Sequence, residues 1–385
     1  MNEPPASRLA GLRLPFDPLL ALATIGLMVC SVVSLDLASG TPAVGHHYAV
    51  RQAIFFAVGT VLAIVISRID YSRLRELKYG VYGLLMGGIL LVAAFGGVTR
   101  GSRRAIQLGL FEVQASELGK VLLIVALSAF AVDRARGLGE RDTTARLVLV
   151  AMIPAILVMA SDLGSGLVYI VILVAVLFVA GVSMRHFAGL AALGVVSVTF
   201  VLLAAPAVGV TVLKPYQVDR LTAFLHPSED PGKAGYNQDQ SRIAVGAGGK
   251  TGRGEASTQG PLKFLPEQTT DFRFAAIAER WGFAGAALVL SLYALLIWRG
   301  LRILTVSKNL YGALIAGGIV AMLLFQVFIN VGMNVGIMPI TGIPLPLLSY
   351  GGSSVISTLL AIGLLQSIYA QGRNVAAAKG RGRSF

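Results

Sequence analysis

Charged residues are scarce in this sequence. Only 13% of its 385 residues are Asp, Glu, Lys or Arg, against about a quarter in soluble globular domains. The apolar share is 55% and the mean hydropathy is +0.76. This composition excludes a disordered chain and argues against a soluble enzyme.

Cysteine and acidic residues are also few. Cys30 is the single cysteine, so neither an intramolecular disulfide nor a thiolate metal cluster can form. The 32 Lys and Arg outnumber the 19 Asp and Glu, which gives a formal charge of +13. In a soluble protein this excess would suggest nucleic acid. In a membrane protein it follows from retention of Lys and Arg on the cytoplasmic side, so no nucleic acid is expected as a partner.

Apolar runs of bilayer-spanning length dominate the chain. A spanning helix needs about 20 mostly apolar residues, and these runs lack the alternating pattern of a membrane β-barrel. They predict an all-α polytopic membrane protein with about ten transmembrane helices. The predicted helices cover residues 18–38, 50–67, 79–97, 117–134, 145–161, 163–182, 187–207, 273–298, 310–336 and 353–371.

The basic residues predict the orientation. Ten spans bring both termini to one side, and a cytoplasmic location for the termini puts most Lys and Arg in cytoplasmic segments. Arg8 and Arg13 precede an apolar run longer than that of a cleaved signal, which indicates a signal anchor. We expect one transmembrane domain over residues 1–372. A basic cytoplasmic tail, 373–385, is expected to be disordered near anionic lipid.

One large extracytoplasmic loop, about residues 208–272, is the only sizeable segment outside the predicted helices. Its region between Pro231 and Gly260 is rich in Gly and poor in apolar residues, and loops this long are usually functional or disordered. The run Gly248–Thr251 resembles the end of a phosphate-binding P-loop. That motif needs Gly where this chain has Ala244, so we expect no nucleotide site.

Ionisable residues in or beside apolar spans are candidates for function. Glu117 and Lys120 lie three apart and share a helix face, either as a structural ion pair or as the wall of a polar cavity. Asp162 precedes an apolar run, where it is either a helix N-cap or a functional group. Asp271 opens the predicted eighth helix. An N-cap there stays ionised, and an ionised carboxylate at the mouth of a bundle is what a general base requires.

Two further apolar segments predict packing. The run 338–354 is rich in Pro and Gly and cannot form a regular helix. Such backbone must be buried or line a cavity at membrane depth, so it is expected against the centre of the bundle; a simple tight loop is the alternative. Gly312, Ala316 and Val320 share one face of the ninth predicted helix. Small residues there favour either packing within the bundle or close approach of a partner helix.

Several separated blocks resemble motifs of the SEDS family, the proteins of shape, elongation, division and sporulation. The resemblance runs from the first helix to about Gln371, and the Ile343–Pro346 variant is similar to the elongation branch. The blocks are Arg104 with Gln107–Phe111, Gln114–Glu117 with Lys120, Asp162–Gly164, Tyr216 and Gln217 with Arg220, Gly235 and Tyr236, Gln240 and Ser241, Phe264–Glu267 with Thr270–Phe272, and Ile343–Pro346 before Leu348–Gly352.

This resemblance implies a ten-helix peptidoglycan glycosyltransferase that polymerises lipid II outside the membrane during cell elongation and shape maintenance. It implies Asp271 as the catalytic residue, and a single carboxylate fits inversion at the anomeric carbon, with Asp271 as general base. The expected substrate-binding residues are Arg104, Glu117, Lys120, Asp162, Arg220, Gln240, Ser241, Glu267, Thr270 and Ser349. The chain departs from the family motifs at Ala105 in place of Trp, Thr269 in place of His and Arg280 in place of Glu.

Cofactors and partners are predicted less directly. No dense carboxylate cluster marks a metal site, so a divalent cation, Mg²⁺ or Mn²⁺, at the leaving diphosphate stays open. The loop has no Ser-x-x-Lys, so crosslinking needs another protein. The resemblance implies a single-span class B penicillin-binding protein, other elongation-complex membrane proteins, and location in the bacterial plasma (inner) membrane.

Three alternatives to a lipid II polymerase remain open at the level of sequence. One is a flippase or transporter of a lipid-linked substrate, which needs no base at the outer face. Another is a polymerase or ligase of a different polyprenyl-linked glycan. The third is a scaffold of the wall machinery without catalysis.

Overall fold

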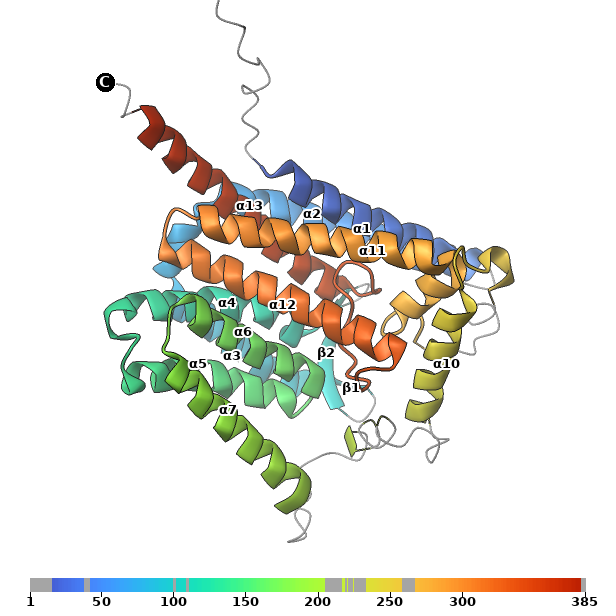
Figure 1. Ribbon diagram of the computed structural model, residues 1–385, viewed down its shortest axis with the longest axis horizontal. Helices are drawn as coiled ribbons and strands as arrows, with labels where there is room; N and C mark the ends of the chain where they lie inside the picture. Colours follow the sequence, from blue (N-terminus) through green and yellow to red (C-terminus); the bar gives the residue numbers. More distant parts are fainter. Residues whose placement is uncertain are drawn as a thin grey trace, which may run out of the picture.

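Long apolar helices make up most of the described chain in this computed structural model (Figure 1). The described residues are 16–37, 42–99, 102–108, 111–204, 217–218, 220, 224, 233–257 and 267–381. The helices are α1 (Pro18–Asp36), α2 (Pro42–Arg68), α3 (Lys78–Phe95), α4 (Ala115–Asp133), α5 (Arg141–Met159), α6 (Leu163–Val179), α7 (Met184–Thr199), α10 (Lys233–Ala247), α11 (Arg273–Val306), α12 (Leu310–Val335) and α13 (Gly352–Arg381). Shorter turns are 3-10 helices at Tyr71–Arg75, Ala135–Gly137 and Gly254–Ala256, and a π-helix at Phe200–Ala204.

The prediction of an all-α polytopic membrane protein is confirmed. Within the described residues, nine helices are long and apolar enough to cross a bilayer. The remaining predicted span is α6, whose 17 residues reach the lower limit of about 17–25 for a spanning helix. The observed helices differ from the predicted ones mainly in where they begin and end. Helix α2 begins at Pro42, before the predicted residue 50, and α11 extends to Val306, beyond the predicted residue 298.

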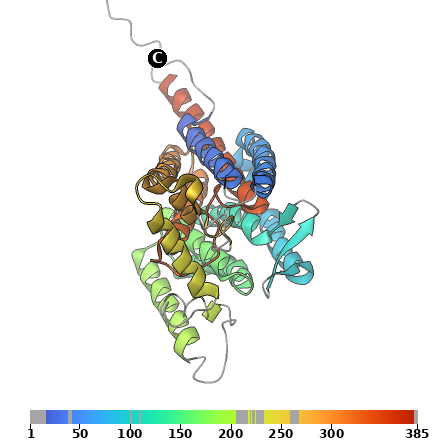
Figure 2. The same cartoon turned by 90° about the vertical axis from the view of Figure 1, so that its right-hand side faces the viewer.

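The predicted disorder of the tail is wrong for residues 373–381. Helix α13 continues to Arg381 and projects beyond the other helices (Figure 2). The cause is local, because this stretch is made largely of Ala, Arg and Lys, which favour helix, and contains no Pro. Residues 382–385 lie outside the described part of the chain.

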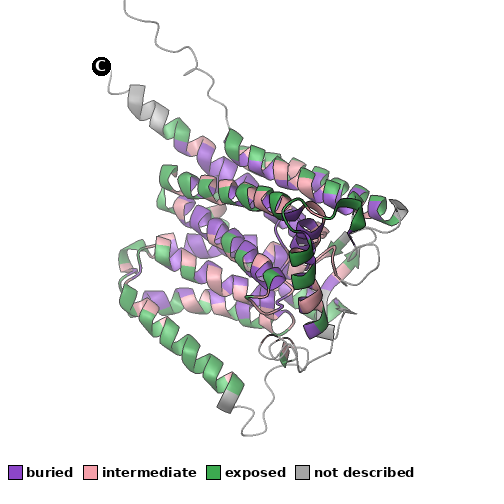
Figure 3. Cartoon of the chain, turned by 45° about the vertical axis from the view of Figure 1, so that its right-hand side comes forward, coloured by how far each residue is buried: buried purple, intermediate pink, exposed green. Residues whose placement is uncertain are grey.

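The core lies among three helices. In the most apolar stretch of each, α4, α12 and α13 have 72% of their residues buried, whereas α7 has none. Figure 3 shows this contrast, with α7 mostly exposed. Helix α13 packs on α2, α12 on α6 and α11, and α4 on α6 and α3. The central helices therefore contact protein on most sides, and the outer ones expose the apolar faces that a bilayer covers.

The small-residue face of α12 packs inside this core. Ala316 is fully buried, and a Cβ on Gly312 would meet the Tyr71 hydroxyl 2.6 Å away. Gly317 lies against Val179 of α6 in the same way. Of the two readings left by the sequence, the structure supports packing within the bundle, and contact of this face with a partner helix is wrong.

A small sheet and one largely polar helix lie at one end of the bundle, called the loop end below (Figure 1). The sheet is an antiparallel meander of β1 (Gly97–Thr99), β2 (Ser102–Leu108) and β3 (Phe111–Val113). The helix is α10, which packs on α11 and α12. Neither the strands nor this helix is predicted by the pattern of apolar runs in the sequence.

Helix α11 is interrupted at Gly282, where φ is 63° and ψ is −158°, a region open essentially to Gly alone. The turn 248–253, which follows α10, fills the interruption. The Arg253 N–H donates to the Glu279 carbonyl, and the Phe283 N–H donates to the Gly249 carbonyl, both at 2.9 Å. The turn thus satisfies backbone groups that the break would leave unpaired.

This contact explains the run Gly248–Thr251 without a nucleotide. A Cβ on Gly248 would lie 2.0 Å from the Ala278 carbonyl, and one on Gly252 would lie 2.1 Å from the Arg280 carbonyl. Glycine is needed at both positions because the backbone of α11 comes so close. The resemblance to a P-loop therefore reflects packing against α11.

We predict that Gly282→Ala destabilises the protein. A Cβ at this position would lie 2.3 Å from the Gly252 nitrogen, and the backbone strain alone costs about 1–3 kcal/mol. The melting temperature in detergent should fall clearly. Gly83→Ala in α3 is the matched control, because nothing lies within 4 Å of its Cβ position and Ala favours helix. Equal melting of the two variants would contradict the account of the break.

Candidate functional site

Asp271 lies in a tight turn, 267–272, just before α11. Glu267 has a φ of 61°, and its carbonyl accepts the N–H groups of Thr270 at 3.1 Å and Phe272 at 3.2 Å. Helix α11 begins at Arg273 with Phe272 as the N-cap residue. The expectation that Asp271 caps this helix is therefore wrong, because the left-handed turn at Glu267 keeps Asp271 outside it.

The turn is held on one side by the segment 338–351, which joins α12 to α13. The Tyr350 N–H donates to the Thr269 carbonyl at 2.8 Å, and the Ser349 hydroxyl donates to the Thr270 carbonyl at 2.6 Å. Ser349 Oγ also accepts the Leu345 N–H at 2.9 Å and is buried. The Pro- and Gly-rich segment is thus packed inside the protein, as its composition predicted, and it positions the turn.

On the other side, two buried asparagines of α12 hold the Asp271 main chain. The side-chain amides of Asn330 and Asn334 donate to the Asp271 carbonyl at 3.1 and 3.2 Å. Asn334 Oδ1 accepts the Ala275 N–H in the first turn of α11 at 3.0 Å. Ser241 of α10 donates to the Asn334 carbonyl at 2.9 Å. Asn334 therefore connects α10, α11 and the Asp271 backbone through its side chain and its main-chain carbonyl.

The carboxylate of Asp271 and the guanidinium of Arg220 both lie beside Gly342. A Cβ on Gly342 would lie 3.3 Å from Arg220 Nη1 and 3.8 Å from Asp271 Oδ2. Gly342 has a φ of 74°, so both its conformation and the close approach favour the absence of a side chain. Asp271 and Arg220 are both partly exposed. An acid and a base of opposite charge thus converge on one accessible point.

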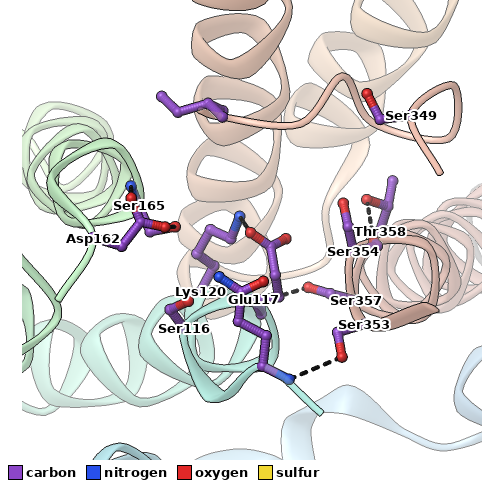
Figure 4. Close-up of polar contacts among 12 residues, drawn as sticks. Ser116, Glu117, Lys120, Asp162, Ser165, Ser349, Ser353, Ser354, Ser357 and Thr358 are labelled. Carbon is purple, nitrogen blue, oxygen red and sulfur yellow. Dashed lines mark hydrogen bonds and ion pairs between the residues drawn. The ribbon is translucent and has the colours of Figure 1, made fainter. Parts of the chain in front are cut away.

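The predicted pair of Glu117 and Lys120 forms a second polar group, on α4 (Figure 4). Lys120 Nζ donates to Glu117 Oε1 at 2.7 Å, and the residues are 1% and 2% exposed. Ser357 of α13 donates to the Glu117 carbonyl at 2.7 Å. Such complete burial favours a structural ion pair over the wall of an open cavity.

Asp162 is the N-cap of α6, as one of its two sequence readings proposed. Its carboxylate accepts the Ser165 N–H at 3.4 Å and the Ser165 hydroxyl at 2.8 Å. Next to it, a Cβ on Gly164 would lie 2.6 Å from the Thr341 carbonyl. Thr341 precedes Gly342, so the same short segment contacts α6 and the surroundings of Asp271.

The remaining predicted site residues lie in the turn 267–272, on α10 and in β2. Glu267 Oε2 accepts the Thr270 hydroxyl at 3.0 Å, so these two residues belong to the turn. Ser241 is fully buried, while Gln240 is half-buried on α10. Arg104 lies in β2, but its side chain falls outside the described part of the chain.

Sequence reasoning missed Asn330 and Asn334. Both are fully buried, and their spacing of four puts them on one face of α12. A signal was available, because two amide side chains at this spacing inside an apolar span need hydrogen-bond partners within the protein. Their partner, a main-chain carbonyl 59 to 63 residues away, could not be read from that signal.

The described side chains do not form a resident metal site. Within that part of the chain, no group of three or more His, Cys, Asp or Glu is placed to hold an ion. A divalent cation, Mg²⁺ or Mn²⁺, at the leaving diphosphate stays a prediction.

Comparison with known sequences identifies extended similarity. Residues 13–374 match the sequence model of a family described as cell cycle proteins and named for FtsW, RodA and SpoVE. The chain is 35% identical to stage V sporulation protein E of Bacillus subtilis, over 91% of this chain and 94% of that protein. It is 36% identical to peptidoglycan glycosyltransferase MrdB of Escherichia coli K12, over 96% and 97%.

Solved structures agree with this similarity. One is a chain of a structure described as showing the structural coordination of polymerization and crosslinking by a peptidoglycan synthase complex. It matches with a TM-score of 0.77 and 32% identity, over 92% of this chain and 98% of that one. The other is the rod shape determining protein RodA of Thermus thermophilus, with a TM-score of 0.64 and 28% identity, over 93% and 97%.

We predict that Lys120→Met lowers stability strongly. The substitution leaves Glu117 buried without its partner, which typically costs about 3–5 kcal/mol. The double variant Glu117→Gln, Lys120→Met removes both charges and should recover much of this loss. Thermal melting of the variants in detergent measures the difference. If the single variant melts like the unchanged protein, the pair is not a structural ion pair.

Proposed function

The chain belongs to the FtsW, RodA and SpoVE family, as its motif blocks predicted, and from this membership we propose that it is a peptidoglycan glycosyltransferase that polymerises lipid II during cell elongation. The observation that carries the proposal is the convergence of Asp271 and Arg220 beside Gly342. A positioned carboxylate and a cation at one accessible point are what transfer of a sugar from a diphosphate needs.

In the proposed reaction a sugar hydroxyl attacks the anomeric carbon of lipid II. Asp271 accepts the hydroxyl proton, the new glycosidic bond forms, and the bond from the anomeric carbon to the diphosphate breaks. The diphosphate leaves with the bonding electron pair. A single carboxylate acting as base gives inversion, because retention typically needs a second carboxylate as nucleophile.

The guanidinium of Arg220 stabilises the charge that develops on the diphosphate. No strong general acid is required, because diphosphate is already a good leaving group. The turn 267–272 keeps Asp271 in place through its main chain. Asn330, Asn334 and Ser349 act as positioning residues. Substrate contacts from Arg104 and Gln240 complete the proposed binding site.

The protein spans the bacterial plasma membrane with both termini in the cytoplasm and the loop end outside. The distribution of Lys and Arg supports this orientation. A class B penicillin-binding protein supplies crosslinking, which is consistent with the similarity to a chain from a peptidoglycan synthase complex. Because Ala316 is buried, that partner contacts a different face of the bundle.

Incubation of the purified full-length protein with lipid II, with and without the partner, tests the function. Glycan strands resolved on a gel support the proposal. A flippase would move lipid II between the leaflets of vesicles and form no strands, and a polymerase of another glycan would be inactive with this substrate. A scaffold would do neither.

We predict that Asp271→Asn lowers polymerisation by about 10²–10⁴-fold, the usual contribution of a general base. Melting should change little, because Asp271 is not the cap of α11 and its main-chain contacts persist. Asp239→Asn on α10 is the matched control, since that carboxylate is half exposed and 3.9 Å from Arg242. Strand synthesis by Asp271→Asn at the rate of the control would overturn the assignment.

We predict that Asn334→Ala lowers kcat about 10- to 100-fold while KM changes little, because the base shifts but substrate contacts remain. The buried Ala275 N–H and the Asp271 carbonyl each lose a partner, so stability should fall by about 1–3 kcal/mol. Rate measurements over a range of lipid II concentrations separate kcat from KM. Asn374→Ala on the exposed end of α13 is the control. A rise in KM at unchanged kcat would mean that Asn334 acts on binding.

A further inference from the structure

Arg273, the first residue of α11, carries a buried charge that the described residues do not neutralise. Its side chain has no exposure to solvent, and Nε donates to Ser34 Oγ of α1 at 3.2 Å. Neither Nη1 nor Nη2 has a hydrogen-bond partner in the described part of the chain. A buried ion without compensation costs several kcal/mol. The native protein is therefore expected to hold a counter-charge at this position.

A small cavity adjoins this guanidinium. Its volume is about 20 Å³, and its polar lining comprises Ser34, Ser257, Gln268, Arg273, Glu279 and Arg280. One water-sized occupant needs about 10–15 Å³ on this measure. The cavity therefore accommodates a single atom-sized ligand and is too small for a phosphate or a carboxylate group.

The charges around the cavity favour an anion. Two guanidinium groups and one carboxylate line it, which leaves an excess of one positive charge. Arg280 Nη1 also donates to the Leu37 carbonyl at the end of α1. Glu279 opposes an anion, but the two guanidinium groups outweigh it in number, and Arg273 presents unpaired N–H donors in a planar fork.

The cavity is separate from the surroundings of the proposed base. The Asp271 carboxylate lies beside Gly342, whereas the Arg273 guanidinium extends to Ser34 of α1. An ion bound here would connect the end of α1 to the first turn of α11. Its effect would be on the stability of the loop end.

We propose that this cavity binds one monovalent anion of halide size, held by the Nη groups of Arg273 and by Arg280. A water molecule satisfies hydrogen bonds but leaves the excess charge in place, whereas a halide does both. The ion neutralises the Arg273 guanidinium, whose side chain has no exposure to solvent. An ion that binds the folded state alone raises the free energy of unfolding by RT ln(1 + [ion]/Kd).

The melting temperature of the full-length protein in detergent tests the proposal. Sodium chloride is titrated against sodium gluconate at constant ionic strength. Chloride and bromide should raise the melting temperature, with a rise that follows the logarithm of the ion concentration above the Kd, and gluconate should not. In Arg273→Met the apparent Kd for chloride should rise at least about tenfold, the loss expected when charge-assisted hydrogen bonds are removed.

Two controls make the result specific. Arg242→Met removes a more exposed guanidinium from α10 and should keep the chloride response. Arg273→Lys retains the charge without the fork, so it should respond weakly, and it replaces Arg273→Met if that variant fails to fold. In bromide-soaked crystals an anomalous peak should lie between Arg273 and Arg280.

Two results would overturn the proposal. One is equal melting of the unchanged protein in chloride and gluconate, with no bromide peak, which means that the cavity holds water only. The other is a chloride response that persists unchanged in Arg273→Met or Arg273→Lys. Neither readout involves polymerisation, so the result is independent of the proposed function.

Discussion

Three successive main-chain carbonyls, those of Thr269, Thr270 and Asp271, accept hydrogen bonds from the segment 338–351 and from α12. Irregular backbone among apolar helices is tolerable only when its polar groups are paired within the protein. This requirement explains why Ser349, Asn330 and Asn334 are buried polar residues in apolar surroundings. The same requirement determines the position of the Asp271 side chain. Asp271 is held by the hydrogen bonds that its main-chain carbonyl accepts, and it does not cap a helix.

The same requirement shapes the rest of the loop end. Helix α11 can break at Gly282 because the turn 248–253 supplies partners for its exposed backbone groups. Helix α10 precedes that turn and also donates a hydrogen bond to Asn334 through Ser241. The loop is thus tied to α11 at the break and to α12 near Asp271. Asn334 therefore links α10 to the main chain of Asp271.

Buried charges at this end fall into two kinds. Glu117 neutralises Lys120 one helical turn away, and Asp162 is satisfied by the start of its own helix. These groups are local, and their spacing in the sequence offered the ion pair and the N-cap as one of two readings each. Arg273 differs, because its nearest acceptor is on α1, more than two hundred residues earlier in the chain. No sequence pattern near Arg273 predicts its contact with Ser34 or the cavity beside it.

The class of protein and the positions of the spans followed from the sequence. The sequence also offered the ion pair on α4 and the cap of α6 as one of two readings each, and motif resemblance predicted Asp271 as the catalytic residue. These features depend on the length of apolar runs and on neighbours within one helical turn, so local chemistry decides them. Tertiary structure alone decided the small sheet, α10, the role of Gly248–Thr251, and which groups surround Asp271. Those features arise where distant segments meet, and each depends on how the other helices pack. Asp271 illustrates both levels, because its spacing favoured a helix cap, and hydrogen bonds from α12 and the segment before α13 assigned it a different position.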